Sequence, residues 1–169
     1  MLWVPFHRDR LPHTQLTQSL YIIPLSQPLF NDIRDLTPQP TSTNETVAVA
    51  AVSAAMEQDA SALLVLTTSG VSAALLSKYR PKVPIITVTR DAATARQLSL
   101  HRGCYTFWYP EKKIAEGSTE WQVDVDNRIR YGLKSALALG MIKPGQTVVA
   151  IQVCSAMDKM RFSLRSSRS

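Results

Sequence analysis

Hydroxyl-bearing residues and a glycine stand together at the end of an apolar run, in LLVLTTSGVS, residues 63–72. This pattern is typical of a buried strand that opens into a loop and then starts a helix. Gly70 lets backbone amides approach a ligand, and the helix start presents N–H groups with partial positive charge, which suits a phosphate. The spacing is not that of a P-loop, and the same residues can instead only cap the helix, so both interpretations stay open. The hydroxyls come from Thr67, Thr68, Ser69 and Ser72.

A second candidate for anion binding lies in WQVDVDNR, where Trp121 and Arg128 are seven residues apart. Seven residues are two turns of a helix, so both side chains lie on one face. A planar guanidinium can hold a phosphate by two bonds, and an indole can stack on a sugar. The alternative is structural: Trp121 packs at the helix start and Arg128 pairs with Asp124, four residues before it.

No set of residues has the arrangement of a catalytic or metal site. The histidines are scattered, and none has an evident nucleophile beside it. Asp124 and Asp126 face different sides of a helix and make a poor metal pair. We expect the two cysteines, Cys104 and Cys154, to be reduced thiols of a cytoplasmic protein, with Cys104 in the core.

Charge and hydropathy narrow the classes of protein further. The 169 residues have a net charge of +6, but half of this excess falls in residues 153–169, which hold four Lys/Arg and one Asp/Glu. The rest of the chain is only mildly basic, which argues against a nucleic-acid binder. No run of 18 apolar residues exists, so we expect no membrane span.

Helical and extended patterns alternate along the chain. Apolar runs predict four strands, and helices are expected between them and before the first strand. Ser42, Thr43 or Asn44 can cap the helix before the first strand, and Asp91 a later one. Alternation of this kind predicts a three-layer α/β/α fold with a mostly parallel sheet of about four strands. The expected strands are 62–67, 83–89, 103–108 and 145–152; the expected helices are a short one after Pro28, with Leu29, Ile33 and Leu36 at helical spacing, and 45–58, 72–79, 91–101 and 118–139.

Several stretches resemble one family. SKYRP, followed by PIITVTR and HRG, and then WQVDVDNRIRYGLKSALALGMIKPGQTVVAIQ, are similar to the C-terminal domain of pyruvate kinase, and nearest to the fungal enzymes. The resemblance covers residues 21–152. It divides the chain into a poorly ordered arm (1–20), a pyruvate kinase C-terminal-like α/β domain (21–152) and a divergent basic tail (153–169).

This resemblance implies a regulatory rather than a catalytic role. Pyruvate kinase transfers a phosphoryl group from phosphoenolpyruvate to ADP, with Mg²⁺ and K⁺ bound in a (β/α)₈ barrel. The 169 residues leave no room for a barrel of about 250 residues, so we expect no catalytic residues and no metal ligands in this chain. In allosteric members, the loop matching residues 67–72 holds one phosphate of fructose 1,6-bisphosphate, and the positions of Trp121 and Arg128 contact the other.

Two departures from the family weaken the implied site. Val71 replaces a residue that is usually polar, and residues 153–169 replace a glycine-rich effector loop and the last strand. We therefore expect the last strand to be missing, effector binding to be weak or lost, and the chain to be a truncated or mis-spliced product. Association with subunits of the homotetrameric enzyme is also expected, and the alternative is a stand-alone module that binds sugar phosphates or partners pyruvate kinase.

Overall fold

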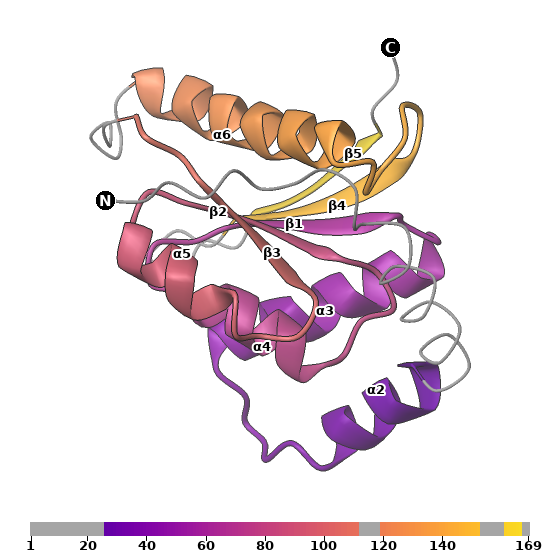
Figure 1. Ribbon diagram of the computed structural model, residues 1–169. Helices are drawn as coiled ribbons and strands as arrows, with labels where there is room; N and C mark the ends of the chain where they lie inside the picture. Colours follow the sequence, from indigo (N-terminus) through magenta and orange to yellow (C-terminus); the bar gives the residue numbers. More distant parts are fainter. Residues whose placement is uncertain (1–25, 112–118, 153–160, 167–169) are drawn as a thin grey trace.

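A five-stranded sheet forms the centre of the protein (Figure 1). The computed structural model describes residues 26–111, 119–152 and 161–166. The strand order is β3-β2-β1-β4-β5; β1 to β4 run parallel, and β5 is antiparallel to β4. The strands are β1 (Ala62–Leu66), β2 (Ile85–Thr89), β3 (Cys104–Trp108), β4 (Thr147–Gln152) and β5 (Arg161–Ser166).

Helices cover both faces of this sheet. On one face lie α3, α4 and α5, and on the other lies α6, while α2 packs outside α3 and α4 (Figure 1). The predicted α/β/α architecture with four parallel strands is therefore confirmed. The helices are α2 (Ser26–Asp35), α3 (Thr43–Glu57), α4 (Val71–Lys78), α5 (Ala92–Leu98) and α6 (Thr119–Ala138).

The fifth strand corrects the expectation that the last strand is missing. β5 pairs with β4 from Thr147↔Ser166 to Gln152↔Arg161, so the outer edge of β4 is covered. Its sequence, RFSLRS, has only two apolar residues at the spacing of a strand, which is too short a pattern to detect. The other residues of the predicted tail, and the predicted arm (1–20), lie outside the described residues.

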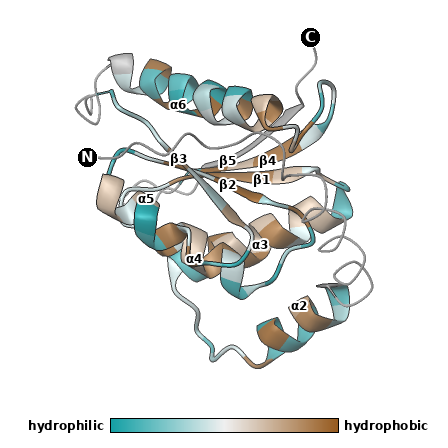
Figure 2. Cartoon of the chain, in the orientation of Figure 1, coloured by the Kyte–Doolittle hydropathy of each residue, from teal (hydrophilic) through white to brown (hydrophobic). Residues whose placement is uncertain are grey.

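Burial on both faces explains why β1 and β2 form the middle of the sheet. All five residues of each strand are buried, as expected for parallel strands covered by helices. Figure 2 shows the same pattern, with hydrophobic residues concentrated in the central strands and in α3 beneath them. Of the three candidate caps before β1, Ser42 is the one used, since its side chain accepts a hydrogen bond from the Glu45 backbone N–H. Asp91 caps α5, as predicted.

The buried residue of α2 is Phe30, which the helical spacing of Leu29, Ile33 and Leu36 did not predict. In α2, Leu29 and Leu36 are exposed, whereas Phe30 is buried against the ring of Tyr79, with 5.9 Å between the ring centroids. Tyr79 also donates a hydrogen bond of 3.0 Å to Glu45, which forms an ion pair with Lys78. This network joins α2, the start of α3 and the end of α4.

Gly132 lets α6 approach the sheet closely. A Cβ atom at this position would lie 2.7 Å from Val88 Cγ2 and 3.1 Å from Leu64 Cδ1. Both neighbours belong to fully buried residues of central strands, so they have little room to move.

We predict that Gly132→Ala destabilises the fold. The gain in helix propensity is at most about 1 kcal/mol, whereas overpacking a rigid core costs about 1–3 kcal/mol, so a net loss of roughly 1–2 kcal/mol is expected in urea unfolding. Val88→Ala makes room for the new methyl group. In that background Gly132→Ala should be neutral or stabilising, and an equal loss in both backgrounds would contradict the steric explanation.

We also predict that Glu45 contributes to stability only above acidic pH. The hydrogen bonds from Lys78 and then from Tyr79 lower the pKa of Glu45 below its ordinary 4.5. This stabilisation is complete above pH 4.5 and is lost as the pH falls through the lowered pKa.

The free energy of unfolding should therefore depend less on pH, below about 4.5, in Glu45→Gln than in the wild type. Tyr79→Phe keeps the ring and removes one hydrogen bond, so it should give an intermediate slope. Equal slopes in all three proteins would show that the network does not select the ionised carboxylate.

Candidate functional site

The topology marks one edge of the sheet as the place for a ligand. From β1 the chain moves outward through β2 to β3 on one side, and then α6 returns it to β4 on the other side of β1. The strand order thus reverses between β1 and β4, and in open α/β sheets ligands bind at such a point, beyond the carboxyl ends of the strands. The loop after β1 is the one that contains Thr67, Thr68, Ser69 and Gly70.

This loop has the backbone shape that brings amides to the start of a helix. Gly70 has a left-handed conformation with φ of 83° and is the N-cap of α4. Its backbone N–H donates to Thr67 Oγ1 at 2.9 Å, so this hydroxyl closes the turn. Thr68 and Ser69 are exposed, and Ser72 is half-buried in the first turn of α4. Val71, the residue that departs from the family pattern, is 49% exposed.

Helix α5 packs against the loop 67–70 and hydrogen-bonds to it. The Thr94 hydroxyl lies 3.1 Å from the Thr68 carbonyl oxygen and 2.6 Å from the Asp91 carboxylate. A Cβ at position 70 would lie 3.1–3.3 Å from Leu98 and Thr94, so α5 packs directly under the glycine. The loop is therefore a fixed part of the domain rather than a free connection.

Trp121 and Arg128 make the structural contacts that were the alternative to anion binding: Trp121 packs near the helix start, and Arg128 pairs with Asp124. Trp121 is half-buried and packs against the core cluster under α6. Arg128 Nε lies 3.2 Å from Asp124 Oδ2, and the exposed fractions of the two side chains are 16% and 4%. The described contacts of the loop are with β2 and α5, whereas Arg128 is held by its own helix.

A cluster around Arg90 was not found from the sequence. Arg90 directly follows β2, and its guanidinium is 2.5 Å from Asp124 Oδ1 and 5.2 Å from the centre of the Tyr109 ring. Its Nε donates to the Glu111 carbonyl oxygen at 2.8 Å. In the sequence, Arg90 stands out only as a charged residue at the carboxyl end of a buried strand. Its partner Asp124 lies 34 residues away, so no local pattern connects the two.

The titratable groups of the described residues offer no evident nucleophile. Burial and then the Glu111 carboxylate raise the pKa of Tyr109 to about 12, so its hydroxyl stays protonated and donates to Glu111 at 2.6 Å. Burial raises the pKa of Cys104 to about 11, so its thiol is protonated at neutral pH. Within residues 26–111, 119–152 and 161–166, no three His, Cys, Asp or Glu residues lie close enough to hold a metal ion. The same part of the chain has no helix long and apolar enough to cross a membrane.

These features define a doubly wound α/β domain with a loop rich in hydroxyl groups at its switch point. Comparison with known proteins agrees with this class. The family model described as pyruvate kinase, alpha/beta domain, matches residues 45–159. Pyruvate kinase from Agaricus bisporus is 62% identical over 125 residues, which are 74% of this chain and 23% of that protein. Pyruvate kinase 2 from Saccharomyces cerevisiae is 51% identical over 124 residues, which are 73% of this chain and 24% of that protein.

The chain therefore belongs to the pyruvate kinase family, through its alpha/beta domain. The resemblance deduced from SKYRP, PIITVTR and HRG, and its closeness to fungal enzymes, are confirmed. The chain spans about a quarter of the length of the relatives that it matches.

We predict that Thr94→Val loosens the loop. The change keeps the shape of a buried side chain but removes its hydroxyl from the Thr68 carbonyl and the Asp91 carboxylate, which should cost about 1–2 kcal/mol in urea unfolding. Hydrogen exchange at residues 67–70 should also become faster. Ser99→Ala, which removes an exposed hydroxyl contact with Ala95 on the same helix, is the control and should stay within about 0.5 kcal/mol. Equal effects would contradict the bracing role.

Proposed function

We propose that this chain carries the regulatory and assembly domain of a pyruvate kinase, and that its loop 67–72 binds one phosphate of fructose 1,6-bisphosphate. The observation that carries the proposal is the start of α4. Its cap is Gly70, which makes no side-chain hydrogen bond to the first turn. A bound anion would supply the acceptors that the cap lacks.

The neighbouring helices α3 and α5, in contrast, have N-cap side chains that accept hydrogen bonds from the first turn. In α3, Ser42 Oγ accepts from the Glu45 N–H at 3.2 Å. In α5, the Asp91 carboxylate accepts from the N–H groups of Ala93 and Thr94 at 3.3 and 2.9 Å. Helix α4 instead has a glycine N-cap, which offers no side-chain acceptor, and follows exposed Thr68 and Ser69. This combination favours a phosphate over simple capping.

For the second phosphate we propose Trp121 and Arg128. Their family positions support the assignment, and Arg128 supplies a positive charge on α6, one turn after Asp124. Binding should be weak, because Val71 has no side-chain donor and because residues 153–160, which lead from β4 to β5, contain no glycine.

Phosphoryl transfer from phosphoenolpyruvate to ADP is proposed only for a longer protein that contains such a domain. Among the described residues, no three His, Cys, Asp or Glu side chains lie close enough together to hold a metal ion, and we derive no catalytic step for this chain. A cytoplasmic location and association with pyruvate kinase subunits are proposed on the same family basis. The alternative is an independent sugar phosphate-binding module, for which the loop would serve equally.

Calorimetry with fructose 1,6-bisphosphate tests the proposed effector site. We expect a dissociation constant of roughly 0.1–1 mM and at least tenfold weaker binding by Ser69→Asp, which places a carboxylate where the phosphate would lie. Thr43→Asp adds the same charge at the exposed start of α3 and should leave binding unchanged.

Absence of heat from the wild type up to millimolar ligand would remove the effector proposal. The same preparation, assayed with phosphoenolpyruvate, ADP, Mg²⁺ and K⁺, should show no turnover. Clear activity would contradict the regulatory assignment.

A further inference from the structure

The hydroxyl of Thr94, on α5, lies between two acceptors and has a single proton to donate. Its Oγ1 is 3.1 Å from the Thr68 carbonyl oxygen and 2.6 Å from Asp91 Oδ2. Thr94 is only 6% exposed, so little water reaches this hydroxyl. Because a hydroxyl donates one hydrogen bond, the carbonyl and the carboxylate compete for the same proton.

The carboxylate is the stronger competitor for the Thr94 proton. Hydrogen bonds to an ionised acceptor are shorter and roughly twice as strong as those between neutral groups. The hydrogen bond from the Thr94 side chain, followed by those from the Thr94 and Ala93 backbone, lowers the pKa of Asp91 below its ordinary 3.8. Asp91 is therefore ionised at neutral pH and takes the larger share of the proton, which leaves the smaller share to the Thr68 carbonyl.

The direction of the Thr68 carbonyl fixes the direction of the next backbone N–H. The Thr68–Ser69 peptide is trans, so its C=O and N–H bonds point in opposite directions. Since the carbonyl oxygen faces Thr94, the Ser69 N–H points away from α5. Within the described residues no acceptor takes this N–H, whereas the Gly70 N–H is already bonded to Thr67 Oγ1. The Ser69 N–H is therefore a donor that a ligand on the exposed side of the loop can use.

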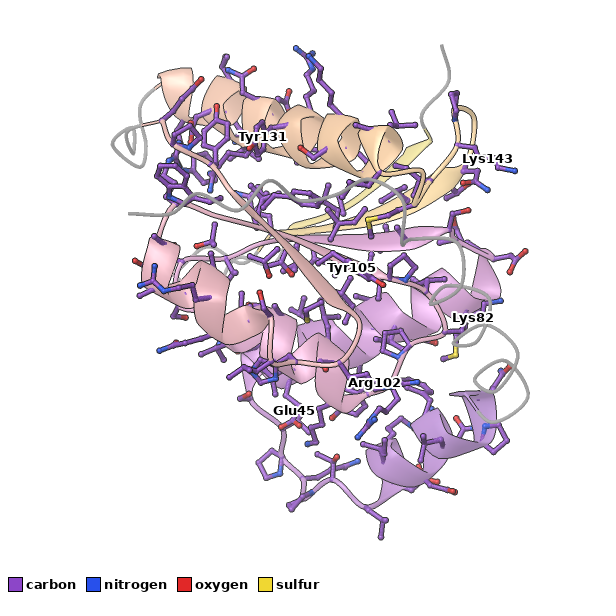
Figure 3. All side chains as sticks on the ribbon, in the orientation of Figure 1. Glu45, Lys82, Arg102, Tyr105, Tyr131 and Lys143 are labelled. Atoms are coloured by element: carbon purple, nitrogen blue, oxygen red, sulfur yellow. The ribbon has the colours of Figure 1, made fainter. Side chains whose placement is uncertain are left out.

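The contact between α5 and the loop is separate from the α6 side of the candidate site. Tyr131, labelled in Figure 3, lies on α6 and packs against the core cluster on that face of the sheet. Leu98 of α5 belongs to the core cluster on the other face. A change at Thr94 should therefore reach the loop through its own contact with Thr68 and not through α6.

We propose that Thr94 is a positioning residue for the effector phosphate: by holding the Thr68 carbonyl it aims the Ser69 N–H at the phosphate, and Asp91 opposes this by competing for the same proton. The inference rests on the proposed function, because it assigns the loop to a phosphate. An anion on the Ser69 N–H polarises the peptide and draws the Thr94 proton toward the Thr68 carbonyl. While the proton stays with Asp91, the peptide is free to turn and the donor is lost to the ligand.

The test is a double-mutant cycle in the full chain, with fructose 1,6-bisphosphate as the probe and calorimetry as the measurement. Thr94→Val removes the donor and should weaken binding about tenfold, whereas Thr94→Ser keeps the hydroxyl and should stay within about threefold of the wild type. Asp91→Asn keeps a good cap for α5 but leaves the Thr94 proton to Thr68, so it should tighten binding about fivefold.

The second background separates competition for the proton from simple removal of a negative charge. In Thr94→Val there is no proton to compete for, so Asp91→Asn should change the affinity by less than about twofold there. An equal gain in both backgrounds would show that Asp91 acts only through its charge and would overturn the proposal. Circular dichroism should confirm that each variant is folded, and Thr94→Ala replaces Thr94→Val, with the same expected direction, if the latter does not fold.

A second readout does not need the effector. The nuclear magnetic resonance shift of the Thr68 carbonyl carbon in the unliganded chain reports the hydrogen bond that this carbonyl accepts. It should move downfield in Asp91→Asn and upfield in Thr94→Val, and a wild-type value in Asp91→Asn would overturn the positioning role. Failure of the wild type to bind fructose 1,6-bisphosphate would remove the proposed function, while this measurement would still decide whether Thr94 and Asp91 control the peptide.

Discussion

The burial of β1 and β2 on both faces is the constraint on which the rest of the structure depends. All five residues of each strand are buried, so helices must cover the sheet from both sides. A chain that covers one face with α4 and α5 must cross to the other face once, and α6 makes that crossing on its way to β4. The reversal places the switch point of the sheet beside the loop after Leu66. The location of the candidate site is therefore a result of packing.

The buried charges near that edge are paired with one another. A buried carboxylate is costly unless it is paired, and Asp124 has an arginine at each oxygen. Arg90 is itself held by the Glu111 carbonyl and by the ring of Tyr109. The cluster also joins three elements, since its members come from the ends of β2 and β3 and from α6.

Local patterns predicted most of the fold and the turn of the loop after β1. The caps at Ser42 and Asp91 and the turn at Gly70 depend on neighbours a few residues away, so their chemistry is visible in the sequence. The pairing of Arg90 with Asp124 spans 34 residues and has no period, so only the folded chain reveals it. The inward residue of α2 was missed because Leu29 and Leu36 have the expected spacing, while the contact with Tyr79 selects Phe30. Strand β5 was missed because its backbone pairing with β4 needs little apolar sequence.

The order of two consecutive residues gives the domain a mechanical property. Arg90 reaches α6 through Asp124, and Asp91, next in the chain, caps α5 on the opposite face of the sheet. A single peptide unit thus connects the contacts of the two helical layers, and α5 in turn contacts the loop at Thr68. The shortest covalent path between the two helical layers is therefore one peptide bond at the end of β2.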